Sequence, residues 1–434
     1  MQIPFWPSFQ GIRHIEFGLN RVLDLLERLD NPHQNLPPTI HFAGTNGKGS
    51  TLNFLYQILK SKDFKVHCYT SPHLEEFNER IVISNNQIDD EALNKCLKTC
   101  QEQSEIHPKI PVTFFEGITV AAFLAFSQVQ ADFLLLETGL GGRLDATNVV
   151  DKVLASIITP ISLDHIEYLG ESLEEITPEK AGIIKKDCPV IIGNQDPKAL
   201  KILKEKAAQK NSQTIIFNED FKISKHDTNF DYITKSQTLN FPNPSMFGSH
   251  QIDNLALAIA ASEFLVPGLG TWFANQVPKP GTDWPARLQK IHLKDTISEL
   301  YIDGSHNVAG ANTVLEFLRS KQDRKIIVIY STLQDKNHQS FLKIIADEID
   351  DLIITTIPNE PKSLEPELIQ ETAKALNLKS QIISNSDILS YIDSKVSSFA
   401  KSTANKPTTF LITGSLYSAG YFLKETKSNI QQKQ

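Results

Sequence analysis

The stretch around residue 45 limits the possible folds of this chain more than any other part of the sequence. Residues 39–44 form an apolar run typical of a buried strand, and residues 48–60 have the apolar spacing of a helix. The turn between them lies in His41-Phe-Ala-Gly-Thr-Asn-Gly-Lys-Gly-Ser-Thr51 and is rich in glycine. A strand, a glycine-rich turn and a helix in this order are typical of an α/β protein with a parallel sheet.

The composition of this turn indicates that it binds phosphate. Its glycines are Gly44, Gly47 and Gly49. Glycine lets backbone N–H groups point at an anion, and the helix N-terminus adds partial positive charge. The pattern predicts that Lys48 reaches the terminal phosphates of a nucleotide and that the Ser50 hydroxyl binds Mg2+. The usual pattern has a glycine where Phe42 stands, so this is a shortened variant, and a glycine-rich turn without a ligand is the alternative.

Strand and helix patterns alternate in two blocks, which predicts two α/β domains. In the first block we expect strands at 39–44, 64–70, 132–137, 153–158 and 189–193, and helices at 48–60, 113–128 and 251–264. In the second block we expect strands at 300–303, 325–330, 352–356, 381–384 and 408–413, with helices such as 309–319 and 339–347. The polar stretch 209–247 has short strand patterns and is expected to form a β-rich edge of the first domain.

A proline-rich stretch separates the two blocks. Residues 277–285 contain three prolines and a glycine, which continue neither a helix nor a sheet. We therefore expect an N-terminal domain at 1–278, a linker at 279–286 and a C-terminal domain at 287–434.

Composition excludes several classes of protein. Lys plus Arg number 43 and Asp plus Glu 51, a net charge of −8, which argues against a nucleic-acid or anionic-membrane partner. Four cysteines in 434 residues do not make a disulfide framework. No apolar run is long enough to span a bilayer, and the N-terminus lacks a secretion signal. These features predict a cytoplasmic protein.

Polar residues at the ends of other expected strands are further candidates for a site. Glu137 ends the apolar run 132–137, where the carboxyl ends of parallel strands form a ligand crevice, and could hold Mg2+ there. His165 follows the run 153–158, and a lone histidine at such a place is more often a hydrogen-bonded structural residue than a ligand. Asp303 and the nearby His306 follow a strand of the second block, and Arg287 is either a phosphate clamp or a surface arginine.

Together these segments resemble the folylpolyglutamate synthases and dihydrofolate synthases, a branch of the ATP-dependent Mur ligases. The resemblance rests on Gly44-Thr-Asn-Gly-Lys-Gly-Ser50, Ser71-Pro-His-Leu74, Glu137-Thr-Gly-Leu-Gly-Gly-Arg-Leu-Asp-Ala-Thr-Asn148, Glu179-Lys-Ala-Gly182, Asp303-Gly-Ser-His-Asn307 and Gly414-Ser-Leu-Tyr417. It implies an N-terminal Mur-ligase-type P-loop ATPase domain and a smaller C-terminal doubly wound α/β domain. The family pattern Pro-Gly-Arg is here Pro-Ala-Arg, with Ala286 in place of glycine, and Ser305 stands where alanine is usual.

The resemblance also implies roles for individual residues. The ATP-binding residues would be Gly47, Lys48, Gly49, Ser50, Asn254, Arg287 and Asp303. The metal-binding residues would be Ser50, Ser71, Glu137 and His165. The residues in contact with the pterin substrate would be Thr113, Phe114, Phe115, Glu116, Leu144, Asp145 and Ala146. Catalytic roles would fall to Lys48, His306 and Lys180, the last of which matches a lysine that the family carbamylates.

The implied activity is an ATP-dependent ligation that joins an acid to an amino acid. The substrates would be ATP, L-glutamate, and either 7,8-dihydropteroate or a folate, with one or two Mg2+ ions and a monomeric enzyme. Three alternatives remain at this point: folylpolyglutamate synthesis alone, a cell-wall Mur-type peptide ligase, and a nucleotide-dependent switch.

Overall fold

The computed structural model describes residues 5–7, 18–275, 284–293, 298–400 and 407–432, so most of the expected linker at 279–286 lies outside the described residues. Two compact units are present. The first comprises residues 1–245 with 249–282, and the second comprises residues 246–248 with 283–434.

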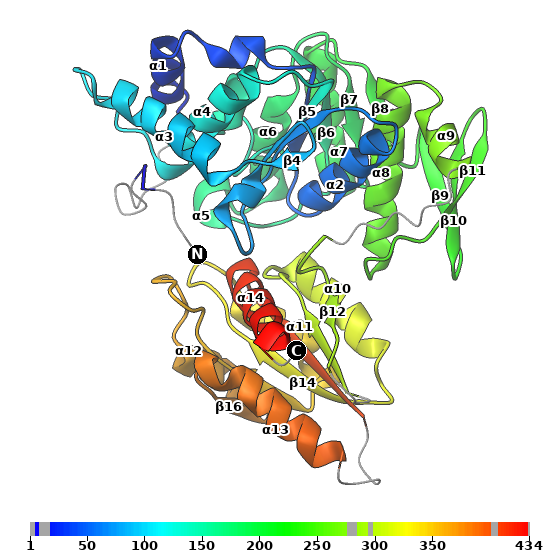
Figure 1. Ribbon diagram of the computed structural model, residues 1–434. Coiled ribbons are helices and arrows are strands. Elements are labelled where there is room, and N and C mark those ends of the chain that lie inside the picture. The colour runs from blue at the N-terminus through cyan, green and yellow to red at the C-terminus, as the bar shows by residue number, and fades with distance from the viewer. Residues whose placement is uncertain (1–4, 8–17, 276–283, 294–297, 401–406, 433–434) are drawn as a thin grey trace. The chain divides into compact units, whose positions relative to one another are not determined.

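The first unit is built on an eight-stranded sheet in its described part (Figure 1). The parallel strands are β1 (Thr39–Ala43), β2 (Val66–Tyr69), β5 (Phe133–Glu137), β6 (Val153–Ile158), β7 (Val190–Ile192) and β8 (Thr214–Ile216). Antiparallel β3 (Ile81–Ile83) and β4 (Asn86–Gln87) extend one edge, and the order is β4-β3-β2-β5-β1-β6-β7-β8. The fully buried β1 lies between β5 and β6, which places the turn after it at the centre of the sheet.

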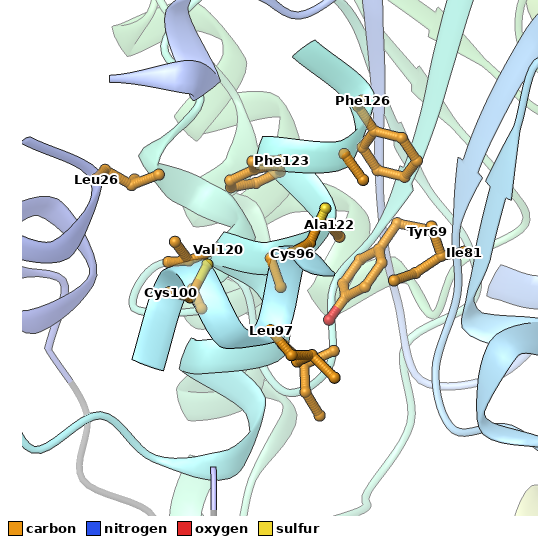
Figure 2. Packing of buried hydrophobic residues seen from close by; sticks show 14 of the residues in the cluster. Leu26, Tyr69, Ile81, Cys96, Leu97, Cys100, Val120, Ala122, Phe123 and Phe126 are labelled. Atoms are coloured by element: carbon orange, nitrogen blue, oxygen red, sulfur yellow. The ribbon is translucent and has the colours of Figure 1, made fainter. Parts of the chain in front are cut away.

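Helices of the first unit bury the apolar faces of this sheet. They are α1 (Asn20–Arg28), α2 (Lys48–Lys60), α3 (Asp90–Glu105), α4 (Phe114–Ser127), α5 (Ile166–Leu169), α6 (Leu173–Lys180), α7 (Pro197–Gln209), α8 (Ser249–Leu265) and α9 (Leu269–Asn275). Figure 2 shows one core, in which Leu26, Cys96, Cys100 and Phe123 from α1, α3 and α4 gather beside the sheet residue Tyr69. A second core joins α6 and α7 to β6, β7 and β8.

An antiparallel three-stranded sheet lies within residues 209–247, as the short polar runs of that stretch predict. It consists of β9 (Phe221–Lys225), β10 (Asn229–Thr234) and β11 (Thr238–Pro242).

The second unit is a smaller α/β domain. In its described part, a six-stranded sheet has the order β12-β13-β17-β14-β15-β16, and β12 alone is antiparallel. The strands are β12 (Gln289–Ile291), β13 (Glu299–Ile302), β14 (Lys325–Tyr330), β15 (Asp351–Ile354), β16 (Ser380–Ile382) and β17 (Thr408–Thr413). The helices are α10 (Val308–Arg319), α11 (His338–Ile345), α12 (Pro366–Ala375), α13 (Ile388–Ala400) and α14 (Leu416–Gln432). The first three share one core with the sheet.

The predicted α/β fold class is therefore confirmed in both units. Each expected strand of the two blocks is present, with its ends within two residues of the predicted bounds. Among the described residues, no helix is long and apolar enough to cross a membrane.

Candidate active site

The turn after β1 has the backbone shape that its glycines predict. Gly44 and Gly47 have φ of 150° and 84°, in the region that favours glycine. A Cβ atom on Gly44 would overlap the side chain of Thr159, and one on Gly47 would lie 2.5 Å from Oδ1 of Asn254. The buried Asn254, on α8, thus packs against the start of α2, where backbone N–H groups are free to bind an anion.

The loop that follows β6 holds this turn in place. The Thr45 hydroxyl donates to the Ser162 carbonyl (2.9 Å) and accepts from the Ser162 amide (3.0 Å). The Thr45 amide donates to the carbonyl of Pro160 at 2.9 Å. Because these bonds join two neighbouring strand ends, the phosphate loop is preorganised before a ligand arrives.

Two lysines meet at one carbonyl of this loop. Nζ of Lys48 donates to the carbonyl oxygens of Gly44 (3.1 Å) and Thr45 (3.3 Å), and Nζ of Lys180 donates to Gly44 at 3.0 Å. Lys180, the last residue of α6, is only 4% exposed. Burial, together with the nearby charge of Lys48, lowers the pKa of Lys180 to about 7. A neutral amine is therefore available in quantity near pH 7.

Two of the expected metal-binding residues also meet. Glu137 ends β5 with its side chain buried, and its Oε2 accepts a hydrogen bond from the Ser71 amide at 3.1 Å. Ser71 follows β2, the neighbour of β5, so the parallel sheet brings the two ends together. His165 follows β6 on the other side of β1, immediately before α5, and its backbone has φ of 51°.

These donors suit magnesium. In the described part of the chain there is no group of three or more His, Cys, Asp and Glu side chains that could hold a metal. Mg2+ does not require such a group, since it binds through one or two carboxylates with water and phosphate oxygens. A buried carboxylate at Glu137 and the buried hydroxyl of Ser50 at the first turn of α2 supply that kind of donor.

The expected pterin-binding residues form two segments that touch. Phe115 lies in the first turn of α4, and its ring occupies the space where a Cβ on Gly139 would lie. Phe115 and Tyr69 have ring centroids 6.1 Å apart, and Phe114 and Phe77 form an edge contact at 6.2 Å. The loop 139–148, which contains Leu144, Asp145 and Ala146, therefore lies against the start of α4.

Thr113 and Glu116 have structural partners in these positions. They form a capping box at the start of α4, and the Glu116 carboxylate accepts two bonds from Arg21 of α1, at 2.8 and 3.1 Å. The same carboxylate accepts the Thr113 amide at 2.7 Å. These bonds fix the start of α4. The aromatic rings of Phe114 and Phe115 are then the apolar groups of its first turn.

The second unit brings its own expected residues together at the end of β13. Asp303 accepts the amides of Leu288 (3.0 Å) and Ser305 (2.8 Å), so it holds the turn that carries Arg287. Nε of Arg287 is buried without a hydrogen-bond partner among the described residues, as expected of a cation that awaits an anion. Nδ1 of His306 donates to the Gly304 carbonyl at 2.9 Å, which ties the imidazole to the turn that carries Asp303.

Several residues that shape the site have no signal in the sequence. Thr45 and Ser162 brace the phosphate loop, Arg21 holds Glu116, and Thr147 bonds both His41 and Asp145. Hydroxyl residues in loops are common, and only their position after a strand could have drawn attention to them.

Comparison with known proteins gives the class first. Residues 42–262 match the model of the Mur ligase middle domain, and residues 286–416 match that of the Mur ligase glutamate ligase domain. A dihydrofolate synthase/folylpolyglutamate synthase of Bacillus subtilis is 33% identical over 92% of this chain and 93% of its own. A folylpolyglutamate synthase of Lacticaseibacillus casei is 33% identical over 92% of each chain.

Solved structures agree with these relatives. E. coli FolC in complex with DHPP and ADP has a TM-score of 0.82 and 25% identity, covering 97% of this chain and 96% of that one. A bifunctional folylpolyglutamate synthase/dihydrofolate synthase with Mn, AMPPNP and L-glutamate bound has a TM-score of 0.79 and 25% identity, covering 95% of each chain. The fold and site define a Mur-type ligase. Within that class, the chain belongs to the dihydrofolate synthase/folylpolyglutamate synthase family.

Proposed function

We propose that this protein is an ATP-dependent ligase that adds L-glutamate to 7,8-dihydropteroate and to the glutamate tail of folates. The observation that carries the proposal is the meeting of Lys48 and Lys180 at the Gly44 carbonyl after β1, with the buried Glu137 carboxylate at the end of the neighbouring strand β5. Two lysines and a carboxylate at the carboxyl end of a parallel sheet suit a nucleoside triphosphate and its metal. Membership of the family supplies the substrates.

The chemistry requires activation of a carboxylate. An oxygen of the acceptor carboxylate (that of dihydropteroate or of a folate tail) attacks the γ-phosphorus of ATP, and ADP leaves. The amino group of L-glutamate then attacks the resulting acyl phosphate, phosphate leaves with the bonding electron pair, and the nitrogen loses a proton to give the amide. Such phosphoryl transfer depends mainly on positioning and charge neutralisation.

The residues of this chain divide that work. Gly47, Lys48, Gly49 and Ser50 bind the phosphates, and Asn254 packs on their loop. In the second unit, Arg287 and Asp303 contribute to nucleotide binding, and His306, in the same loop as Asp303, has a catalytic role. Ser50, Ser71, Glu137 and His165 would hold Mg2+, which would supply positive charge to neutralise the phosphates. The neutral amine of Lys180 is the form that would attack CO2 to give a carbamate, with loss of one proton from the nitrogen to solvent, and the carbamate would supply a further anionic ligand for a metal.

The start of α4 (residues 113–116) and the loop 139–148 select the acceptor substrate. Phe114 and Phe115 offer rings to a pterin, while Thr113 and Glu116 fix their helix. Leu144, Asp145 and Ala146 form the facing loop. We further propose a cytoplasmic monomer with only small-molecule partners, in which residues 1–278 and 287–434 are the domains and 279–286 the linker.

Folylpolyglutamate synthesis alone is the second candidate, because the Lacticaseibacillus casei relative carries only that name. The test measures ADP release with ATP, Mg2+ and L-glutamate, comparing 7,8-dihydropteroate with tetrahydrofolate as the acceptor. Turnover with both acceptors supports the full proposal, and turnover with tetrahydrofolate alone supports the second candidate. Turnover with neither would overturn both and would direct attention to uridine-diphosphate-linked cell-wall substrates.

A further inference from the structure

A buried chain of hydrogen bonds links β1 to the loop 139–148. Nε2 of His41, on β1, lies 2.8 Å from the hydroxyl of Thr147, and that hydroxyl donates to Oδ1 of Asp145 at 2.6 Å. His41 and Thr147 are fully buried, and Asp145 is 5% exposed. This series of hydrogen bonds connects β1, which leads into the phosphate loop, with the loop 139–148, which lies against α4.

The direction of each bond follows from the number of protons available. A threonine hydroxyl has one proton, and here it is donated to the carboxylate, so the bond from His41 must run from Nε2–H to the hydroxyl oxygen. His41 is then a neutral imidazole with a bare Nδ1, and that atom is buried without a hydrogen-bond partner among the described residues. Burial lowers the pKa of His41 to about 3, in agreement with a neutral ring. An unpartnered buried nitrogen is unfavourable for stability, so the histidine serves something other than packing.

The Asp145 carboxylate, at the other end of this series of hydrogen bonds, accepts its hydrogen bonds from residues of its own loop. Oδ2 of Asp145 accepts the amides of Gly139 and Leu140, both at 2.9 Å, while Oδ1 accepts the Thr147 amide at 3.0 Å in addition to the hydroxyl. Burial raises the pKa of Asp145, and these four donors oppose that shift because they bind the charged form. Asp145 thus holds the loop closed on itself.

The shape of this loop matters at its contact with α4. Gly139, whose amide Asp145 holds, is the residue that lies under the Phe115 ring. A displaced Asp145 would release Gly139, and the ring would lose the surface that supports it.

We propose that His41 and Thr147 are positioning residues for acceptor binding, because they orient Asp145 and through it the surface formed by Gly139 and Phe115. This inference rests on the proposed function, since it assumes that the acceptor binds at that surface. It assigns to Asp145 a role in ordering the loop, with its four lone-pair positions filled from within the protein.

The test compares Thr147→Val, which keeps the shape and removes the hydroxyl, with Thr147→Ser, which keeps the hydroxyl. Thr39→Val is the matched control, because Thr39 is buried at the other end of β1 and donates only to the Pro37 carbonyl, at 2.8 Å. For each variant, KM is measured for ATP and for 7,8-dihydropteroate or tetrahydrofolate, and acceptor binding is measured by calorimetry without ATP.

We expect Thr147→Val to weaken acceptor binding and raise its KM by about ten- to a hundredfold, with the KM for ATP within about twofold of wild type. Thr147→Ser should restore most of the affinity, and Thr39→Val should change neither constant. Unchanged acceptor binding in Thr147→Val, or an equal rise in both KM values, would overturn the inference while the activity of the wild type still supported the proposed function. A wild type that turns over neither acceptor would overturn both.

If Thr147→Val does not fold, a second pair of variants gives the same answer from the other end of the chain. His41→Gln retains an N–H donor near the Nε2 position, and His41→Leu removes it. The leucine variant should lose acceptor affinity and the glutamine variant should keep most of it, whereas equal behaviour of the two would contradict the role of the hydrogen bond.

Discussion

Two turns of the molecule can be compared, the phosphate loop of the first unit and the turn before β12 in the second. Both adopt left-handed backbone conformations, but with different residue types. Both contain residues with positive φ beside an expected nucleotide-binding cation. In the phosphate loop these residues are glycines, Gly44 and Gly47. In the turn they are Ala286 (φ 59°) and Leu288 (φ 47°), which carry side chains and are buried.

The difference shows how a strained conformation can persist without glycine. A left-handed conformation disfavours a residue with a side chain by about 1–2 kcal/mol. Here the surrounding bonds impose it, because Asp303 accepts the Leu288 amide at 3.0 Å and the Gly304 amide donates to the Ala286 carbonyl at 2.9 Å. In the first site glycine makes the positive φ accessible without strain, whereas in the second the surrounding hydrogen bonds hold residues with side chains in that conformation.

The largest effect is expected at the cation of the phosphate loop. Lys48→Ala removes the charge nearest the expected phosphates and should lower kcat/KM by about a thousandfold, since preorganised charge dominates phosphoryl transfer. Lys60→Ala, at the exposed end of the same helix, is the control and should leave kinetics unchanged. Near-normal turnover of Lys48→Ala with an unchanged melting temperature would contradict the proposed function.

Lys180 should make stability depend on pH. Its pKa is lowered from 10.5 to about 7 in the folded protein, so between these values the unfolded chain binds a proton that the folded chain lacks. The wild-type free energy of unfolding therefore gains a rising contribution of up to about 1.4 kcal/mol per pH unit from pH 7 upward, which Lys180→Met lacks. Urea unfolding at pH 7, 8 and 9, without bicarbonate, measures the difference between the two proteins. A difference that stays constant with pH would show that Lys180 is not buried as a neutral amine.

Alanine variants of Gly47 and Gly268 distinguish the effect of backbone strain from that of a steric clash. Gly47 and Gly268 both have φ of 84°, but a Cβ on Gly268 would have open space, whereas one on Gly47 would meet Asn254. Both alanine variants should lose about 1–2 kcal/mol of unfolding free energy from strain. Only Gly47→Ala should also raise the KM for ATP, by roughly tenfold, because the loop must move away from Asn254. Equal kinetics in the two variants would refute a role for the close packing.

The smallest effect should come from the turn of the second unit. Ala286→Gly removes the strain of the left-handed conformation while adding freedom to the unfolded chain, so we expect the free energy of unfolding to change by no more than about 1 kcal/mol. Ala311→Gly is the control, because Ala311 is equally buried but lies within α10, where glycine is unfavourable by about 1 kcal/mol or more. If chemical denaturation finds Ala286→Gly as destabilising as the control, the neighbours do not hold strain at this turn.

Much of the framework could be predicted because it depends on local pattern. The bounds of α2 agree with the prediction, and β1 ends one residue earlier, since a short, largely apolar segment and a glycine-rich turn mark both. The carboxyl ends of parallel strands share one edge, so Glu137 at a strand end could be assigned to a site without knowledge of its partners.

The remaining features depend on contacts between distant residues. His41 and Thr147 are 106 positions apart, and Arg21 and Glu116 are 95 apart, and no local pattern pairs them. The positive φ of Ala286 could not be predicted from the sequence either, because turns with positive φ are normally recognised by a glycine. The resemblance drew attention to that position only as a departure from Pro-Gly-Arg.

The central position of β1 in the sheet determines how its amides exchange with solvent during unfolding. All of its residues are buried, and it pairs with β5 on one side and β6 on the other. Its amides should therefore exchange with deuterium only when the whole first unit unfolds, while exposed β4 at the sheet edge exchanges through local fraying. The phosphate loop begins at the end of this strand, so fraying at the β4 edge should not by itself disturb the loop.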